Sequence, residues 1–139
     1  MLFGKEHVDR YEATDGEEGH DWQNGTSILI LTTKGRKSGE ERKTPLIYQE
    51  NDGDYVVVAS KGGYPDHPAW YLNLTDDPDV RVQVKGDRFP ARARTAMPNE
   101  KSDLWKKMTS AWPDYDKYQE KTDREIPVVV LERADDSGH

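Results

Sequence analysis

The chain has 139 residues, of which 33% are hydrophobic and 34% charged, and its formal net charge is −7 at pH 7. This length suits one domain with a single core, and the acidic balance disfavours nucleic-acid binding, which uses a basic surface. The absence of cysteine excludes disulfides, thiolate chemistry and cysteine-bound zinc. The sequence contains neither a signal peptide nor an apolar run of membrane-spanning length, so we expect a cytoplasmic protein, free or peripheral to the membrane, without a stable membrane anchor.

The first part of the chain contains one predicted helix and one predicted strand. Residues 5–13 favour a short helix, and glycines interrupt the sequence that follows it. We expect residues 1–25 to form a leader segment that packs on the main domain. Residues 26–34 (TSILILTTK) are β-branched and apolar on both faces, which predicts a well-buried strand.

Two hairpins are predicted in the middle of the chain. Residues 44–50 and 54–61 are joined by an Asn-Asp-Gly turn, which is typical of a tight hairpin. Residues 79–86 and 88–95 alternate between apolar and polar side chains on either side of a Gly-Asp turn. We expect their valine, phenylalanine and alanine side chains to point inward, and their arginine, lysine and Gln83 side chains to point outward.

Short helices are predicted on either side of the second hairpin. Asp66 or His67 is placed to cap the first of these helices, which Pro78 ends. Asn99 is the predicted cap of the second, whose apolar positions recur at helical spacing. A further helical turn is expected after Pro113.

The end of the chain completes the predicted fold. Residues 126–132 predict a last strand, and residues 134–139 a polar tail. Five or six strands joined mostly by hairpins, with short helices, indicate a mainly β (α+β) antiparallel barrel rather than a doubly wound α/β fold. We therefore expect one barrel domain over residues 26–133.

The loop KGRKSGEERK, residues 34–43, carries five basic and two acidic side chains within an acidic protein. Gly35 and Gly39 allow successive backbone N–H groups to turn toward one point, an arrangement that suits a phosphate or carboxylate. A solvated basic loop between strands is the other interpretation. The loop does not match a Walker motif, and the chain has no G-x-G-x-x-G motif, so any anion site here is of another kind.

Aromatic residues occur in two further segments. Trp70 and Tyr71 follow paired glycines, which permit a backbone to approach a flat ligand closely, although both side chains also suit a core or its rim. Tyr115 and Tyr118 are three residues apart and share a helix face, so they suit either a pocket wall or a structural anchor. No metal site is predicted, because the histidines lack ligand spacing: His7, His20, His67 and His139.

Three ordered blocks of sequence resemble the deazaflavin-dependent nitroreductases of actinobacteria: LTTKGRKSGEERKTPLIY, VVVASKGGYPDHPAWYLNL and WPDYDKYQEKTDREIPVVVLE. The resemblance implies a split β-barrel of the FMN-binding type, often a homodimer, that binds coenzyme F420. It also implies hydride transfer from the reduced deazaflavin to a small-molecule acceptor, namely a quinone, a nitroaromatic compound or another activated acceptor such as an enone.

The resemblance further implies which residues form the site. The contacts with the coenzyme phosphate and oligoglutamate tail fall on Arg36, Lys37, Ser38, Arg42, Lys43, Thr44, Pro45, Leu46 and Ile47. The contacts with the ring fall on Val58, Ala59, Ser60, Lys61, Ala69, Trp70, Tyr71, Leu72, Asn73 and Tyr115. The acceptor is expected to contact Trp112, Tyr115 and Tyr118.

Ser60 and Tyr115 are the expected catalytic residues, as hydrogen-bond donors to the reduced acceptor. Solvent is an alternative source of the proton. Two other functions remain open at this point. One is a split-barrel reductase that binds FMN, which the long basic loop disfavours because a single terminal phosphate needs fewer cations. The other is a deazaflavin-binding or carrier protein without turnover.

Overall fold

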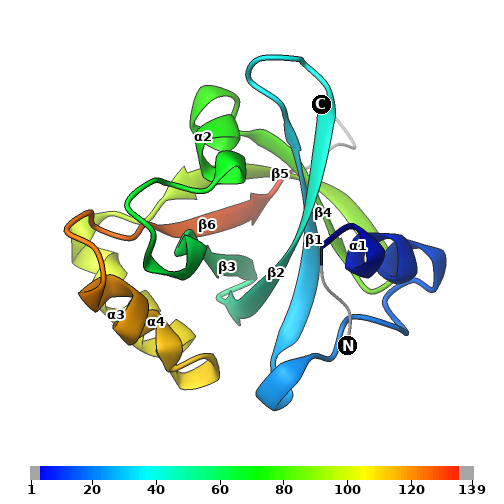
Figure 1. Ribbon diagram of the computed structural model, residues 1–139. Coiled ribbons are helices and arrows are strands. Elements are labelled where there is room, and N and C mark those ends of the chain that lie inside the picture. Colours follow the sequence, from blue (N-terminus) through cyan, green and yellow to red (C-terminus); the bar gives the residue numbers. More distant parts are fainter. Residues whose placement is uncertain (1–3, 135–139) are drawn as a thin grey trace.

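The computed structural model describes residues 4–134, so residues 135–139 of the predicted polar tail lie outside the described residues. Within that range, the strands form a closed barrel in the order β1-β2-β3-β6-β5-β4, and every neighbouring pair is antiparallel (Figure 1). This confirms the predicted mainly β antiparallel barrel. The strands are β1 Ser27–Lys34, β2 Glu41–Asn51, β3 Asp54–Val58, β4 Asp79–Val84, β5 Asp87–Thr95 and β6 Val128–Arg133.

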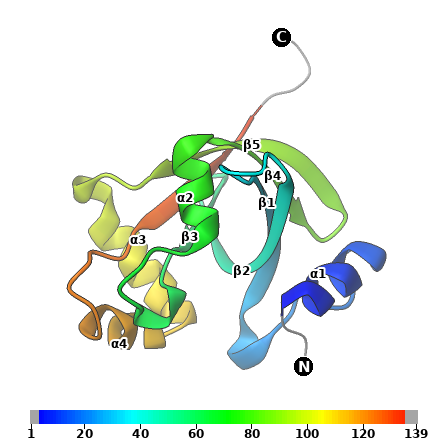
Figure 2. The ribbon, with the colours of Figure 1, turned by 45° about the horizontal axis from the view of Figure 1, so that its top comes forward.

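Short helices cover the barrel on two sides. Figures 1 and 2 show α1 on one side of the barrel, with α3 and α4 on the opposite side. The helices are α1 Gly4–Ala13, α2 Ala69–Asp76, α3 Pro98–Ala111 and α4 Asp114–Glu120. No helix within residues 4–134 is both long and apolar enough to cross a membrane.

Both faces of β1 are buried, as its sequence predicts. Leu29 and Leu31 point into the barrel core, where they join side chains from the other strands. Ile28 and Ile30 lie on the opposite face and pack against Val8 of α1. Helix α1 therefore makes a smaller core of its own on the outside of the barrel.

The β2 strand has an incomplete set of strand neighbours. It pairs with β1 from Glu41 to Tyr48, but with β3 over only three residue pairs, Gln49 to Asn51. Among the described residues, the segment 41–48 therefore has a strand partner on one side only. The strand also begins three residues before the predicted start at 44, because residues 41–43 continue the pairing with β1.

The expectation that Gln83 points to solvent is wrong, since its side chain is only 5% exposed. Tyr11 of α1 covers this part of β4. Its hydroxyl donates to the Ile28 carbonyl at 2.9 Å and accepts from the Lys85 backbone N–H at 2.7 Å. The Gln83 amide is satisfied by donating to the Lys85 carbonyl at 2.8 Å. A packed helix thus buries a polar position that strand alternation assigns to water.

The prediction that Asp66 or His67 caps α2 is wrong. The N-cap position is Pro68, and no side chain there accepts a hydrogen bond from the helix. His67 instead lies with its ring Nδ1 3.2 Å from Nη1 of Arg124, which comes from the segment before β6. The His67 side chain, which the local sequence assigns to the cap, therefore contacts a distant part of the chain instead.

The predicted cap of α3, Asn99, is also wrong by two residues. Met97 is the N-cap, and the helix begins at Pro98, whose missing N–H costs nothing at a first helical position. The Glu100 carboxylate accepts a hydrogen bond from the Met97 backbone N–H at 2.9 Å. Glu100 also forms a close ion pair with Arg94 of β5, which joins the start of α3 to the barrel.

Candidate active site

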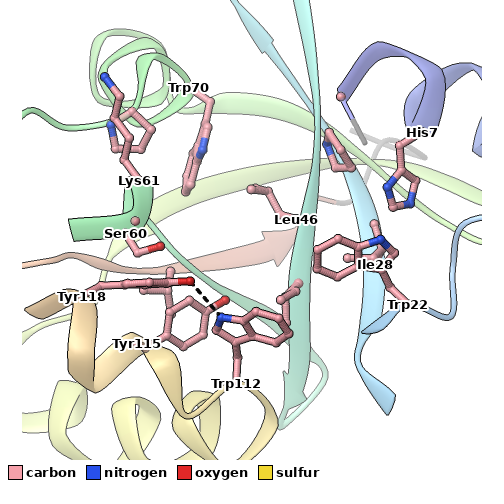
Figure 3. A pocket seen from close by; sticks show the side chains of 16 residues that line it. His7, Trp22, Ile28, Leu46, Ser60, Lys61, Trp70, Trp112, Tyr115 and Tyr118 are labelled. Atoms are coloured by element: carbon pink, nitrogen blue, oxygen red, sulfur yellow. Dashed lines mark hydrogen bonds between the residues drawn. The ribbon is translucent and has the colours of Figure 1, made fainter. Parts of the chain in front are cut away.

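A cavity of about 450 Å³ lies beside the part of β2 that β3 does not cover (Figure 3). Its walls are mainly apolar and aromatic, which is the character of most small-molecule sites. They come from the leader segment, from β1 to β3, from α2 and the loop before it, and from α4 and the turn before it. The lining residues are Gly4, His7, Trp22, Ile28, Pro45, Leu46, Ile47, Val58, Ser60, Lys61, Gly62, Pro68, Trp70, Trp112, Tyr115 and Tyr118.

The loop after β3 forms one wall of this cavity and contains Ser60, Lys61 and Gly62. Lys61 and Gly62 have left-handed backbone angles, with φ of 45° and 63°. Gly63 follows with φ of 85°, and a Cβ atom added there would lie 2.6 Å from the Tyr118 carbonyl oxygen. Glycine is therefore required where this loop packs against α4.

Aromatic side chains from α4 and the turn before it form the wall nearest the open edge of β2. The Trp112 Nε1–H donates a hydrogen bond to the Tyr118 hydroxyl at 3.3 Å (Figure 3). Tyr115 is 5% exposed, and its hydroxyl makes no hydrogen bond with another residue in the range 4–134. Burial, together with the nearby Tyr118, raises the pKa of Tyr115 well above its usual value of 10.0. Its hydroxyl thus remains protonated and able to donate.

The leader segment contributes a wall that the sequence did not predict. The Trp22 ring stacks on the Trp112 ring, with centroids 5.8 Å apart and an interplanar angle of 29°. His7 lies beside Trp22, at 6.3 Å between ring centroids, and its Nε2 is 2.7 Å from the Gly19 carbonyl oxygen. The one sequence feature that indicates an inward-pointing His7 is its helical spacing with the apolar residues Val8 and Tyr11. The lining residues missed from the sequence are Gly4, His7, Trp22, Ile28, Gly62 and Pro68.

A second pocket of about 390 Å³ is formed by the basic loop and α2. Asn73 holds this loop in place, since its Oδ1 accepts from the Arg36 backbone N–H at 3.2 Å and from the Arg36 guanidinium at 3.0 Å. Trp70 lines both this pocket and the apolar cavity, so the two adjoin. The lining residues are Gly35, Arg36, Lys37, Ser38, Arg42, Lys43, Thr44, Ala69, Trp70 and Asn73.

The charges of the basic loop are only partly neutralised. Lys43 pairs with Glu12 of α1 at 2.6 Å, and Arg42 lies 3.6 Å from Glu40. Lys37 forms no ion pair with any residue in the described part of the chain, and Arg36 bonds to a neutral amide. The pocket therefore presents uncompensated positive charge, which is what an anionic group requires.

The structure brings most of the predicted site residues together in these two pockets. The apolar cavity contains Pro45, Leu46, Ile47, Val58, Ser60, Lys61, Trp70, Trp112, Tyr115 and Tyr118. The basic pocket contains Arg36, Lys37, Ser38, Arg42, Lys43, Thr44, Ala69, Trp70 and Asn73.

Three predicted ring contacts line neither pocket. Ala59 is fully buried in the barrel core. The Tyr71 hydroxyl shares a hydrogen bond with Thr95 at 2.8 Å, outside both pockets. Leu72 follows Tyr71 in α2 and also lines neither pocket. Within residues 4–134, no cluster of three or more histidine or acidic side chains is arranged to hold a metal ion, and His139 lies outside the described range.

Comparison with known proteins places this chain in a family. The family model described as "F420H(2)-dependent quinone reductase" matches residues 3–133. An F420H(2)-dependent quinone reductase of Mycobacterium tuberculosis is 39% identical over 126 residues, which cover 88% of this chain and 85% of that protein.

Solved structures agree with this match. The structure of an F420-H2 dependent reductase is 45% identical, with a TM-score of 0.70, and covers 76% of this chain and 93% of that chain. Another, described as a domain-swapped dimer, is 41% identical, with a TM-score of 0.74, and covers 92% and 96% of the two chains. The resemblance stated from the sequence is confirmed: the chain belongs to the F420H(2)-dependent quinone reductase family.

Proposed function

We propose that this protein is an F420H2-dependent reductase that transfers a hydride from the reduced deazaflavin coenzyme to a quinone, a nitroaromatic compound or another activated acceptor. The observation that carries this proposal is the adjacency of two chemically different pockets with Trp70 in common. One is apolar and aromatic, and the other is basic. A ligand with a flat ring at one end and anionic groups at the other matches both.

The residues present fit coenzyme F420. The phosphate and glutamate carboxylates of this coenzyme are anions, and Lys37, Arg36 and Arg42 supply cations in one pocket. Its ring system is flat, and the cavity beside Trp70, Ser60 and Lys61 is lined for such a group. When bound, the coenzyme supplies the hydride, which is chemistry that no side chain of this protein provides.

The protein itself supplies orientation, exclusion of water and hydrogen bonds. The rings of Trp112 and Tyr118 form an apolar wall on which a planar acceptor stacks. A quinone or nitro group gains negative charge on oxygen as it is reduced. We propose that the hydroxyls of Ser60 and Tyr115 donate hydrogen bonds to that oxygen. Because the pKa of Tyr115 is raised by burial, solvent rather than this phenol is the proposed final proton source.

We also propose that the protein works as a homodimer. Support comes from the 41% identical relative that is described as a domain-swapped dimer. Light scattering of the purified protein measures this directly. A mass near 15.9 kDa, that of one chain, would contradict it.

The function is tested by titrating the purified protein with oxidised F420 and, separately, with FMN, followed by fluorescence. Reduced F420 is then added with menadione or a nitroaromatic compound, and reoxidation is recorded at the deazaflavin absorbance. Tight F420 binding with acceptor-dependent reoxidation is the expected result. Preference for FMN would assign the site to a flavin reductase, and binding without reoxidation would assign it to a carrier.

A further inference from the structure

Arg124 lies in the segment between α4 and β6, outside both pockets, yet its guanidinium reaches the loop that forms the cavity wall. All three guanidinium nitrogens donate hydrogen bonds to backbone carbonyls of that loop. Nη2 donates to the Ser60 carbonyl at 2.7 Å, Nη1 donates to the Ala59 carbonyl at 3.2 Å, and Nε donates to the Tyr64 carbonyl at 2.9 Å. Nη1 also lies 3.2 Å from Nδ1 of His67.

This arrangement uses the planar fork of arginine, which presents several donors in fixed directions and which lysine cannot reproduce. The Ala59, Ser60 and Tyr64 carbonyls span both ends of the loop, so one side chain fixes its start and its end. The backbone of the loop makes three further hydrogen bonds among the described residues. The Ala59 N–H donates to the Pro127 carbonyl at 3.0 Å, and two short turns run from the Gly63 N–H to the Ser60 carbonyl and from the Tyr64 N–H to the Lys61 carbonyl. The Pro127 bond joins only the start of the loop to the chain before β6, and the two turns shape the loop internally, whereas Arg124 also holds its end at Tyr64.

The contact between Arg124 and His67 requires a neutral histidine ring. Arginine has only donors, so Nδ1 of His67 is the acceptor in this contact, and its ring proton resides on Nε2. The ring also packs against Tyr71, with centroids 4.9 Å apart. Burial and the charge of Arg124 lower the pKa of His67, whereas neighbouring Asp66 raises it. The net shift is downward, which favours the neutral ring that the contact needs.

We propose that Arg124, with neutral His67 as its side-chain acceptor, is a positioning residue that holds Ser60 and Lys61 in place at the cavity wall. Arg124 acts through the backbone of the loop and does not itself line either pocket. The geometric part of this inference is independent of the ligand. Its consequence for coenzyme affinity rests on the proposed function of the cavity.

The loop part is tested first, without any ligand. Hydrogen–deuterium exchange of peptides covering residues 59–67 is compared among the wild type, Arg124→Gln and Arg124→Lys. The matched control is Arg92→Gln, which removes an exposed arginine paired with Asp79 on the barrel surface. We expect faster exchange of this loop in both Arg124 variants and unchanged exchange in the control. Loop exchange equal to that of the wild type in a folded Arg124 variant would overturn the proposal.

The consequence for the site is tested by titrating the same proteins with oxidised F420. Loss of the fork is expected to raise the Kd about tenfold, which corresponds to about 1.4 kcal/mol. Arg124→Lys is expected to recover little of this loss, because lysine keeps the charge but not the fork. Recovery of wild-type affinity by lysine would show that charge alone matters and would overturn the positioning role. If Arg124→Gln does not fold, Arg124→Lys supplies the same comparisons.

The pH dependence separates positioning from general stability. His67→Asn keeps an acceptor near the position of Nδ1 but does not titrate. We expect the wild type to lose F420 affinity relative to His67→Asn as the pH falls below the usual pKa of histidine, 6.5. Comparing the two proteins at each pH cancels the ionisation of the coenzyme. Parallel pH profiles would contradict the role of His67. If the wild type binds no F420, the proposed function fails, while the exchange experiment still decides whether Arg124 holds the loop.

Discussion

The indole rings of Trp22 and Trp112 stack with their centroids 5.8 Å apart, although the two residues belong to opposite ends of the chain. Trp22 belongs to the leader, and Trp112 precedes α4, so this contact closes the cavity between two elements that flank the barrel. The leader therefore lines the candidate site as well as covering the core.

We predict that Trp22→Ala weakens acceptor binding more than coenzyme binding. Aromatic stacking contributes about 0.5–1.5 kcal/mol beyond buried area, so the KM for menadione should rise roughly two- to tenfold. Trp22→Phe keeps an aromatic face and should recover most of the affinity. Steady-state kinetics at saturating reduced F420 measure this effect. An unchanged KM in Trp22→Ala would show that the acceptor does not use this wall.

Lys37→Ala should weaken coenzyme binding and leave the acceptor KM unchanged. Lys37 lines the basic pocket and has no ion pair within the described residues, so its removal deletes attraction to an anion without freeing a carboxylate. A charge-assisted contact contributes about 1.5 kcal/mol, so the Kd for F420 should rise about tenfold, and less at high salt. Lys106→Ala, an exposed change on α3, is the control for net charge. An equal loss of F420 affinity in both variants would show that Lys37 has no specific role.

Tyr115→Phe is predicted to reduce kcat about three- to tenfold, the effect of losing one neutral hydrogen bond of about 1 kcal/mol. Because burial raises the pKa of Tyr115, we expect no fall in wild-type kcat from its ionisation up to about pH 10. The pH profile of single-turnover reoxidation measures both effects. A kcat in Tyr115→Phe equal to that of the wild type would assign the hydrogen bond to Ser60 or to water.

The same pKa shift predicts how stability changes in alkali. The folded-state pKa of Tyr115 lies above the unfolded value, so its contribution to stability is complete below about pH 10 and declines as the pH rises toward the folded value. Chemical denaturation at about pH 8 and about pH 11 should therefore show a smaller alkaline loss of stability in Tyr115→Phe than in the wild type. Identical losses would mean that other groups, such as buried Tyr48, dominate alkaline unfolding.

The sequence was most informative where local patterns decide the structure. The apolar, β-branched run of β1 and the turn between β4 and β5 specify strands without help from distant residues. That turn lies at Lys85 and Gly86, one residue before the predicted Gly-Asp turn, because Asp87 already pairs with Val84. The burial of Gln83 and the position of Trp22 depend instead on where the leader packs, which no periodicity records. The cap of α2 was misplaced for a similar reason, since His67 lies against Arg124 from elsewhere in the chain. The cap of α3 was misplaced for a local reason, because Pro98 begins the helix and Glu100 bonds back to the Met97 N–H.

The candidate site shows the same division. The excess of basic residues in the loop 34–43 and the aromatic pair Trp70 and Tyr71 are visible in the sequence, but only the structure separates them. Trp70 joins the two pockets, while Tyr71 bonds to Thr95 outside both. Neighbouring residues on one helix point in different directions, so adjacency in sequence does not establish a shared role. The roles assigned to individual site residues remain predictions for the experiments above.

Gly63→Ala should destabilise the protein and displace the cavity wall. Its φ of 85° disfavours a side chain, and a Cβ atom there would lie 2.6 Å from the Tyr118 carbonyl oxygen. Gly53→Ala is a matched control, because Gly53 has φ of 87° and no atom within 4 Å of an added Cβ. We expect a loss of about 1 kcal/mol in the control and about 3 kcal/mol in Gly63→Ala, with weaker F420 binding only in the latter. Thermal denaturation measures the loss of stability, and titration measures the change in F420 binding. An equal loss of stability in the two variants would exclude the clash.

The open edge of β2 also bears on how this molecule avoids aggregation. An edge without a strand neighbour invites strands from other chains. Here Ile47 of that edge lines the same cavity as Trp112 and Tyr118, so a strand that approaches this edge meets aromatic side chains. We therefore expect the wall that is proposed to receive the acceptor also to limit aggregation through this edge. Variants that enlarge the cavity by trimming this wall should be screened for self-association as well as for activity.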